Sequence, residues 1–273
     1  MSEPAAGAAA GDGAAPRPGR TRLEREGVLA RVVLDNPRAR NALTTAMYEE
    51  LATACEEVAA DPSVRLVSIT GAGEAFAAGT DVADLVAVRS GDDGVAYERE
   101  ITRVLSAVRA LDVPVLALVD GPAVGGGLAV VACCDLVYAT PSARFGAPVA
   151  RTLGNCVSPG TTSRLRASLG RAMTTELLLT GRLASAEEAR AAGLVTGVVE
   201  RAELAGVEQQ VLERVQQCSP VSIAAAKELG RRLDDRAAAV EHDDVYRTVY
   251  GSEDFAEGVS AFLDRRRPVF PGR

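Results

Sequence analysis

Two glycine-rich loops carry the clearest sign of chemistry in this sequence. One holds three consecutive glycines, residues 125–127, within DGPAVGGGLAVVACCD (120–135), and the other is GAGEAFAAGTD (71–81). Glycine weakens a buried element, so three in a row predict that another group approaches the backbone closely. We expect both loops to present backbone N–H groups at the same end of a parallel sheet, each just before a helix. Such amides stabilise negative charge on a developing oxyanion. Alternatively, both loops are only tight turns between a strand and a helix.

Several other kinds of site are disfavoured by residue spacing. GPAVGGG lacks the GxGxxG spacing of a dinucleotide site, and no GK[ST] follows any glycine loop. The GxSxG turn of a serine hydrolase is absent, and no spacing supports a dyad of Ser158 and His242. His242 is the single histidine and the five cysteines form no CxxC, so the sequence predicts no metal site. We interpret the cysteines as reduced, small hydrophobic residues and leave only Cys156 open for chemistry.

Composition narrows the class of protein and its partners. The chain has 273 residues, 47% of them hydrophobic and 25% charged, which is typical of a globular protein with a large core. A net charge of −7 argues against nucleic acid as the main partner. Every apolar run is interrupted before it reaches the length of a membrane span, and the N-terminus lacks the apolar block of a secretory signal. We therefore expect a cytoplasmic protein whose Ala/Gly/Pro-rich residues 1–20 form a disordered tail.

The loops are placed by alternating strand and helix patterns. Residues 21–35 indicate two strands around Gly27, and residues 44–60 have the spacing of an amphipathic helix that ends before Asp61-Pro62. Further strands are predicted at 64–70, 113–119 and 135–140, with a helix ending near Leu111 and a short buried helix after the glycine triplet. This alternation favours βαβ crossovers and a largely parallel sheet. From Ser158 the chain is mostly helical, apart from a brief strand within 194–200, and its composition changes near residue 200.

Several long motifs in this order resemble the crotonase, or enoyl-CoA hydratase/isomerase, superfamily from about residue 21 to the C-terminus. The matching blocks are LDNPRARNAL (34–43), SITGAGEAFAAGTDV (68–82), DGPAVGGGLAVVACCDLVYAT (120–140), ARFGAP (143–148), ELLLTGRLASAEEARAAGLVTGVV (176–199) and EDFAEGVSAFLDRRRPVF (253–270). The resemblance implies an α/β fold, a spiral of ββα units over residues 21–200. It also implies a helical C-terminal part, 201–273, that makes homotrimers, often paired into hexamers.

The resemblance also assigns a substrate class and binding residues. It implies that an acyl-CoA thioester binds with its carbonyl oxygen at the N–H groups of Thr80 and Gly126, which stabilise the thioester enolate. Coenzyme A is then part of the substrate, and no separate cofactor is expected. The residues implied to contact its adenine and pantetheine are Arg40, Ala42, Ala78, Asp81 and Val82. By residue type alone, Asp81 is equally a helix N-cap and Arg40 a solvated loop charge. The cluster Arg265–Arg267 is a second candidate for the phosphates, or else ordinary surface.

The sequence departs from the hydratase pattern at the two positions that matter most. Hydration of an enoyl thioester needs one carboxylate to deprotonate water and a second to protonate the α-carbon. The resembling hydratases carry glutamates there, whereas this chain has Ala129 and Val149. A one-residue insertion between Pro148 and Gly154 also allows Ala150 to take the place of Val149. None of these side chains can move a proton.

Candidate side chains for the chemistry are therefore sought elsewhere. Ser158 falls where several family members carry a catalytic aspartate, and Asn155 is expected on the same pocket wall. His242 is expected on a C-terminal helix one turn from Tyr246, in a region that some family members use for the pocket. The alternative for His242 is a partly exposed helix residue. Arg151, Thr152 and Cys156 are the other polar residues expected on that wall.

Two hypotheses follow for the function. The first is an enzyme that uses the oxyanion hole with other acid or base groups, as an isomerase, a decarboxylase or a C–C lyase. Within it, hydration by other acid and base groups stays open. The second is a non-catalytic acyl-CoA-binding protein that kept the pocket and lost turnover.

Overall fold

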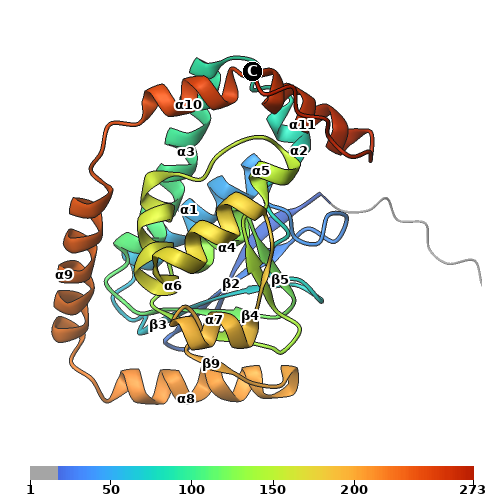
Figure 1. The fold of residues 1–273 in the computed structure, drawn as a ribbon. Coiled ribbons are helices and arrows are strands. Elements are labelled where there is room, and N and C mark those ends of the chain that lie inside the picture. Colours follow the sequence, from blue (N-terminus) through green and yellow to red (C-terminus); the bar gives the residue numbers. More distant parts are fainter. Residues whose placement is uncertain (1–17) are drawn as a thin grey trace, which may run out of the picture.

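The structure, a computed structural model, describes residues 18–273 (Figure 1). Most of the predicted tail, residues 1–17, lies outside the described residues. The tail was predicted to extend to residue 20. That bound is wrong at Arg20, which is the first residue of the first strand. Among the described residues, no helix is both long enough and apolar enough to cross a membrane.

A six-stranded sheet lies at the centre, in the order β1-β2-β3-β4-β6-β9. Its strands are β1 (Arg20–Glu26), β2 (Leu29–Asp35), β3 (Leu66–Gly71), β4 (Val115–Val119), β6 (Leu136–Ala139) and β9 (Gly197–Val198). β1 and β2 form an antiparallel hairpin, and all the other neighbours are parallel. The predicted parallel α/β sheet is therefore confirmed. Because β3 and β4 are adjacent and parallel, the loops that follow them leave the sheet at the same end.

A second, smaller sheet comprises β5 (Pro122–Val124), β7 (Arg144–Gly146) and β8 (Ala184–Ser185). These strands have only two or three residues each, too few to show a period of two in the sequence. The segment of the second glycine loop that precedes the triplet is thus a strand rather than an open loop.

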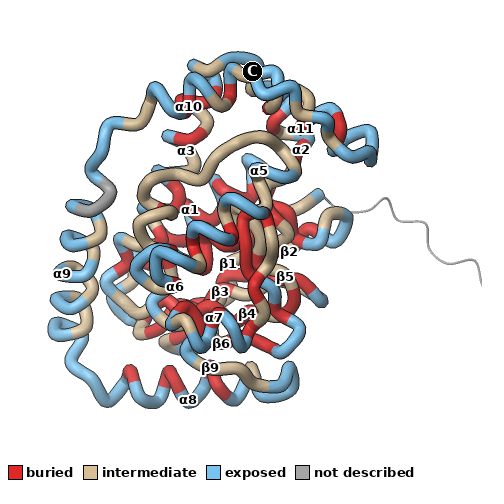
Figure 2. The backbone as a smooth tube through the Cα atoms, in the orientation of Figure 1, coloured by how far each residue is buried: buried red, intermediate tan, exposed pale blue. Residues whose placement is uncertain are grey.

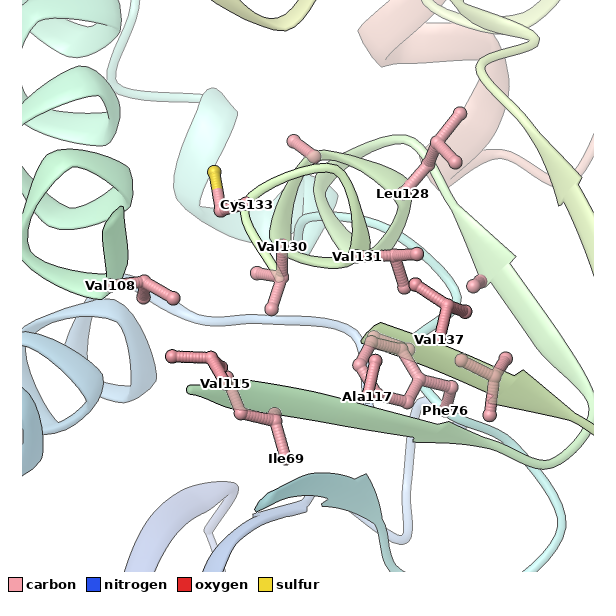
Figure 3. Close-up of a cluster of buried hydrophobic side chains, with 14 of the residues drawn as sticks. Ile69, Phe76, Val108, Val115, Ala117, Leu128, Val130, Val131, Cys133 and Val137 are labelled. Atoms are coloured by element: carbon pink, nitrogen blue, oxygen red, sulfur yellow. The ribbon is translucent and has the colours of Figure 1, made fainter. Parts of the chain in front are cut away.

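Helices cover the sheet and form the walls around it. The first seven are α1 (Thr45–Ala59), α2 (Val82–Leu85), α3 (Gly91–Ala110), α4 (Gly126–Val131), α5 (Val149–Thr152), α6 (Pro159–Thr180) and α7 (Ala186–Ala192). Figure 3 shows α4 lying over β4, with Val130 and Val131 directed toward Val115 and Ala117. The predicted short buried helix after the triplet is confirmed by this packing.

The C-terminal helices follow one another around the outside of the core (Figure 1). A 3-10 turn at Arg201–Glu203 leads into α8 (Leu204–Gln216), α9 (Pro220–Ala238), α10 (Asp243–Tyr250) and α11 (Glu253–Leu263). α10 packs against α3, and α11 packs against α2. The predicted helical stretch around 245–262 is two helices, because the first ends at Gly251 and Ser252 caps the second. The division at residue 200 into a spiral core and a helical C-terminal part stays a prediction.

Burial is concentrated on the sheet and on the helix faces against it, whereas α9 is largely exposed (Figure 2). Small aliphatic side chains dominate the core, as the low aromatic content of the sequence predicts.

Candidate active site

A cavity of about 180 Å³ lies where the two glycine loops meet the segment that contains α5. Thr80 and Gly126 line it from the two loops, and α3 and Phe262 of α11 complete its walls. About 15 Å³ holds one water molecule, so this volume accommodates a small acyl group and not only solvent.

The two loops are joined directly by backbone hydrogen bonds. The Ala77 amide donates to the Pro122 carbonyl over 3.0 Å, and the Val124 amide donates to the Ala77 carbonyl over 2.9 Å. Gly126 is the first residue of α4, where an amide has no partner within its own helix. Within the described residues, neither the Thr80 nor the Gly126 amide donates a hydrogen bond to the chain. Two unpaired N–H groups therefore stand on one cavity.

Close packing of the chain against itself explains the glycine triplet. Gly125 has φ +52°, in the region that favours glycine. A Cβ atom at Gly126 would overlap with the Tyr48 hydroxyl and approach Thr80 Oγ1 to 2.9 Å, and one at Gly127 would overlap with the Ala77 carbonyl. The close approach predicted from the triplet is real, and its partners are Tyr48 and the loop 77–80 of the same chain. The turn interpretation is thus correct for the backbone, and the same packing leaves the Gly126 amide at the cavity.

Two phenol hydroxyl groups contact the Thr80 side chain. Tyr48 Oη and Thr80 Oγ1 lie 3.0 Å apart, and Tyr97 Oη donates to Thr80 Oγ1 over 3.4 Å. Burial raises the pKa of both tyrosines, so both phenols stay protonated near neutral pH. They fix the Thr80 side chain and, through it, the loop that carries the Thr80 amide.

A buried carboxyl group, Glu98 on α3, faces the same cavity and was missed by the sequence analysis. Only 6% of its surface is exposed, and its Oε1 accepts a short hydrogen bond from Tyr250 Oη on α10. Asn155 Nδ2 donates to the same Tyr250 oxygen over 3.4 Å. Burial raises the pKa of Glu98 to about 7, against the opposing effects of the Tyr250 hydrogen bond and of His242.

A signal for Glu98 was present in the helical pattern of α3. Val95, Glu98 and Leu105 lie three and seven residues apart and are all buried on one face. A charged residue at a core position of an amphipathic helix is unusual and marks either a buried ion pair or a functional group.

The structure brings some of the predicted side chains to the cavity and places others outside it. Asn155, Cys156, Ser158 and Thr152 line it. The Ser158 hydroxyl caps α6, since it accepts from the Thr161 amide over 3.2 Å and donates to Thr161 Oγ1 over 3.0 Å. Burial raises the pKa of the Cys156 thiol to about 12, which suits a small hydrophobic residue rather than a nucleophile.

The predictions for His242 and Arg151 need correction. His242 is the N-cap residue of α10, not a residue within the helix, and it lines a neighbouring cavity together with Ser158. Its ring contacts Tyr246 edge-on at 4.9 Å between centroids. Arg151 is exposed and lines an outer cavity with Arg266 and Arg267. α5 turns the Arg151 side chain away while Thr152, the next residue, faces inward.

The predicted coenzyme A contacts lie together along two paired segments. The Ala78 amide donates to the Arg40 carbonyl over 3.0 Å, and the Asp81 amide donates to the Leu43 carbonyl over 2.8 Å. Ala78 and Val82 line the cavity, Arg40 is exposed and Ala42 is buried beside them. The Asp81 carboxylate caps α2 by accepting from the Ala83 amide over 3.0 Å, as its residue type alone suggested. In the second candidate cluster, Arg266 is ion-paired with Glu257.

The two apolar residues at the expected glutamate positions both face the cavity. Ala129 and Val149 line it, whereas Ala150 is exposed and belongs to the outer cavity. Val149, and not Ala150, is therefore the residue presented to a ligand. Within residues 18–273, no three His, Cys, Asp or Glu side chains gather where they could hold a metal ion.

Comparisons of sequence and of fold with known proteins point to one family. A sequence model of the family "Enoyl-CoA hydratase/isomerase" matches residues 24–273. The crotonyl-CoA hydratase of Syntrophomonas wolfei is 35% identical over 259 residues, which cover 91% of this chain and 96% of that protein. The crystal structure of an enoyl-CoA hydratase/carnithine racemase from Magnetospirillum magneticum is 34% identical, with a TM-score of 0.75 over 93% of this chain and 96% of that one. A methylmalonyl-CoA decarboxylase in complex with 2-nitronate-propionyl-CoA is 25% identical, with a TM-score of 0.83 over 94% of this chain and 100% of that one.

Proposed function

This chain belongs to the enoyl-CoA hydratase/isomerase family, the crotonase superfamily, and from that premise we propose that it enolises acyl-CoA thioesters by a route other than two-glutamate hydration. In this proposal the N–H groups of Thr80 and Gly126 hold the thioester oxygen while negative charge develops on it. Arg40, Ala42, Ala78, Asp81 and Val82 flank the coenzyme A portion of the substrate.

The pair of unpaired amides on one cavity carries the proposal. Both come from rigid, hydrogen-bonded loops, so they need no reorganisation when charge appears on the ligand. The Gly126 amide adds the N-terminal end of α4. The chain is acidic overall, with a net charge of −7, so fixed amides and local cations have to offset repulsion of an anionic ligand.

The proposed reaction follows from what Ala129 and Val149 cannot do. Neither side chain on the cavity deprotonates water, so the enolate is used for isomerisation, decarboxylation or C–C bond chemistry rather than for hydration. The similarity to a methylmalonyl-CoA decarboxylase is in keeping with an enolate reaction that needs no water.

Two assays test the proposal. In the first, steady-state hydration of short and medium 2-enoyl-CoAs is compared with that of a two-glutamate hydratase, and we expect at most trace turnover. In the second, butyryl-CoA is incubated with the protein in D₂O and deuterium at the α-carbon is followed by NMR. Turnover at the rate of the control hydratase would overturn the non-hydratase route, and binding without exchange would leave only an acyl-CoA-binding protein.

A matched pair of variants isolates the Gly126 amide. Gly126→Pro removes the N–H at the first helical position, where proline is tolerated, and Gly126→Ala keeps it. Both crowd Tyr48 and Thr80, so crowding is common to the two. We expect Gly126→Pro to exchange deuterium about 100-fold more slowly than Gly126→Ala, because loss of one oxyanion donor costs about 100- to 1,000-fold. Equal rates would contradict a role for this amide.

A further inference from the structure

Two glutamates are almost fully buried in the described chain, and their surroundings differ. Glu208 on α8 is 5% exposed, forms an ion pair with Arg31 and accepts a hydrogen bond from Ser68. Glu98 is 6% exposed and, within residues 18–273, pairs with no arginine or lysine. A buried carboxylate is normally matched by a cation, as Glu208 is. Glu98 thus lacks the partner that would explain it as a structural charge.

The position of Glu98 points to a ligand. It lines the same cavity as the Thr80 and Gly126 amides and as Ala129 and Val149. Tyr250 donates a hydrogen bond to Oε1. Oε2 accepts no hydrogen bond within the described residues, and it does not belong to the polar atoms that are both inaccessible to solvent and without a partner. Oε2 is therefore the carboxyl oxygen that is open to the cavity.

The hydrogen bonds around Glu98 can serve both of its protonation states. When Glu98 is ionised, Tyr250 donates to it. When a proton binds to Oε2, Oε1 is still an acceptor, and Tyr250 continues to donate to it. Asn155 Nδ2 donates to Tyr250 Oη in both states. The network therefore accommodates a proton that arrives and leaves.

We propose that Glu98 is the general base and acid of the enolisation, and that Tyr250 is its positioning residue. The inference rests on the proposed function. A C–H bond at the α-carbon, or at the γ-carbon of a 3-enoyl thioester, breaks and its proton binds to Glu98 Oε2. The electron pair forms the enolate, whose charge the Thr80 and Gly126 amides hold. Return of a proton from Glu98 to the α- or γ-carbon restores the carboxylate, so nothing is oxidised or reduced. In D₂O the carboxyl proton exchanges with solvent before it returns, which places deuterium on the substrate carbon.

The first test compares two isosteric variants in the α-deuterium assay with butyryl-CoA. Glu98→Gln removes the base, and Glu208→Gln changes an equally buried glutamate outside the cavity. A general base contributes about 100- to 10,000-fold, so we expect Glu98→Gln to lose at least 100-fold in exchange. Glu208→Gln should exchange like the wild type. Circular dichroism shows whether each variant is folded, and calorimetry shows whether it binds butyryl-CoA.

The second test uses the pH dependence of exchange. The titratable groups around Glu98 are Tyr48, Tyr97, Cys156, His242, Tyr246 and Tyr250. The wild-type rate should rise with pH through about 7, as Glu98 ionises. Tyr250→Phe removes a hydrogen bond that favours the carboxylate, so the profile should move to higher pH. His242→Gln removes a group that lowers the pKa of Glu98, so the inflection should remain and move to higher pH. Loss of the inflection in this variant would contradict its assignment to Glu98.

The outcomes separate the two proposals. If the wild type exchanges deuterium, Gly126→Pro loses exchange and Glu98→Gln retains it, the role of Glu98 is overturned and the proposed function stands. If Tyr250→Phe leaves the pH profile unmoved, the positioning role of Tyr250 is overturned and its hydroxyl is only structural. If the wild type binds butyryl-CoA without any exchange, both proposals are overturned.

Discussion

At the scale of single residues, the site combines backbone amides with one carboxyl group. The amides of Thr80 and Gly126 donate no hydrogen bond to the described chain because of where they lie. Thr80 is the middle residue of a β-bridge whose hydrogen bonds to Leu43 come from Gly79 and Asp81, and Gly126 begins α4. Glu98 differs from them because its charge depends on pH in the physiological range. An apolar wall without a cation raises the pKa of a carboxyl group, and it also makes the ionised form costly to the fold.

This cost predicts how stability changes with pH. The pKa of Glu98 is raised to about 7 from an ordinary value of 4.5, so the native state holds this proton more tightly than the unfolded chain does. The stability that the native state gains by holding this proton is complete below about pH 4.5 and is lost as pH rises through about 7. Glu98→Gln removes this dependence. We expect the variant to exceed the wild type in free energy of unfolding at pH 8, by up to about 3 kcal/mol, since tenfold in acidity corresponds to about 1.4 kcal/mol.

Urea denaturation at pH 5 and pH 8 measures this difference. At pH 5 the wild-type carboxyl group is mostly protonated, so the two proteins should be close in stability. Glu208→Gln serves as the contrast, because it strands Arg31 and should destabilise the protein at both values. A Glu98→Gln variant that is less stable than the wild type at pH 8 would contradict the expected cost.

At the scale of elements, the contact between α3 and α10 positions the carboxyl group. Tyr250 lies at the end of α10, and Gly94 lies one turn before Glu98 on α3. A Cβ atom at Gly94 would overlap with the Tyr250 ring. The missing side chain therefore lets α10 approach closely enough for Tyr250 to reach Glu98. This explains a glycine inside a long helix, where it would otherwise cost about 1 kcal/mol.

Gly94→Ala should separate the two helices. The higher helix propensity of alanine is outweighed by overpacking against Tyr250, so we expect a net loss of about 1–2 kcal/mol in the free energy of unfolding. The pH profile of deuterium exchange should also move upward, as in Tyr250→Phe. Gly206→Ala on α8 is the matched control, since nothing lies within 4 Å of its added Cβ, and it should not destabilise. Equal free energies of unfolding for the two variants would mean that α10 moves away from α3 without loss of stability.

At the scale of the whole molecule, the exposed apolar surface of α9 is not covered by any other part of the described chain. This helix carries exposed apolar side chains at Val221, Leu229 and Leu233, with 79%, 63% and 72% of their surface accessible. Exposed apolar side chains on one helix favour contact with another protein surface. Together with the family membership, this supports our proposal that the chain forms homotrimers or hexamers.

Light scattering on the purified protein tests the assembly. We expect the mass of three or six chains for the wild type and a smaller species for Leu229→Glu, because a charge at an apolar contact opposes association. Gln210→Glu places the same charge on the exposed face of α8 and should leave the mass unchanged. A monomeric wild type would rule out the assembly.

The sequence by itself determined the local features of this protein. Hydrophobic periodicity predicted the long helices and the parallel strands, and the order of motifs indicated the family that the comparisons then showed. The two glycine loops and the apolar Ala129 and Val149 were found in the same way, since each is defined by residues close together in the chain. Such patterns follow from backbone conformation and side-chain spacing, which a short segment specifies alone.

Only the tertiary structure decided which distant residues share a cavity. Glu98 and Tyr250 are 152 positions apart, and no local pattern connects them. Their contact exists because α10 returns across α3 at Gly94, a path set by the packing of the C-terminal helices. The same packing placed His242 in the neighbouring cavity and turned Arg151 outward. The direction of a side chain depends on the whole fold, because one residue's shift along a helix turns it by about 100°.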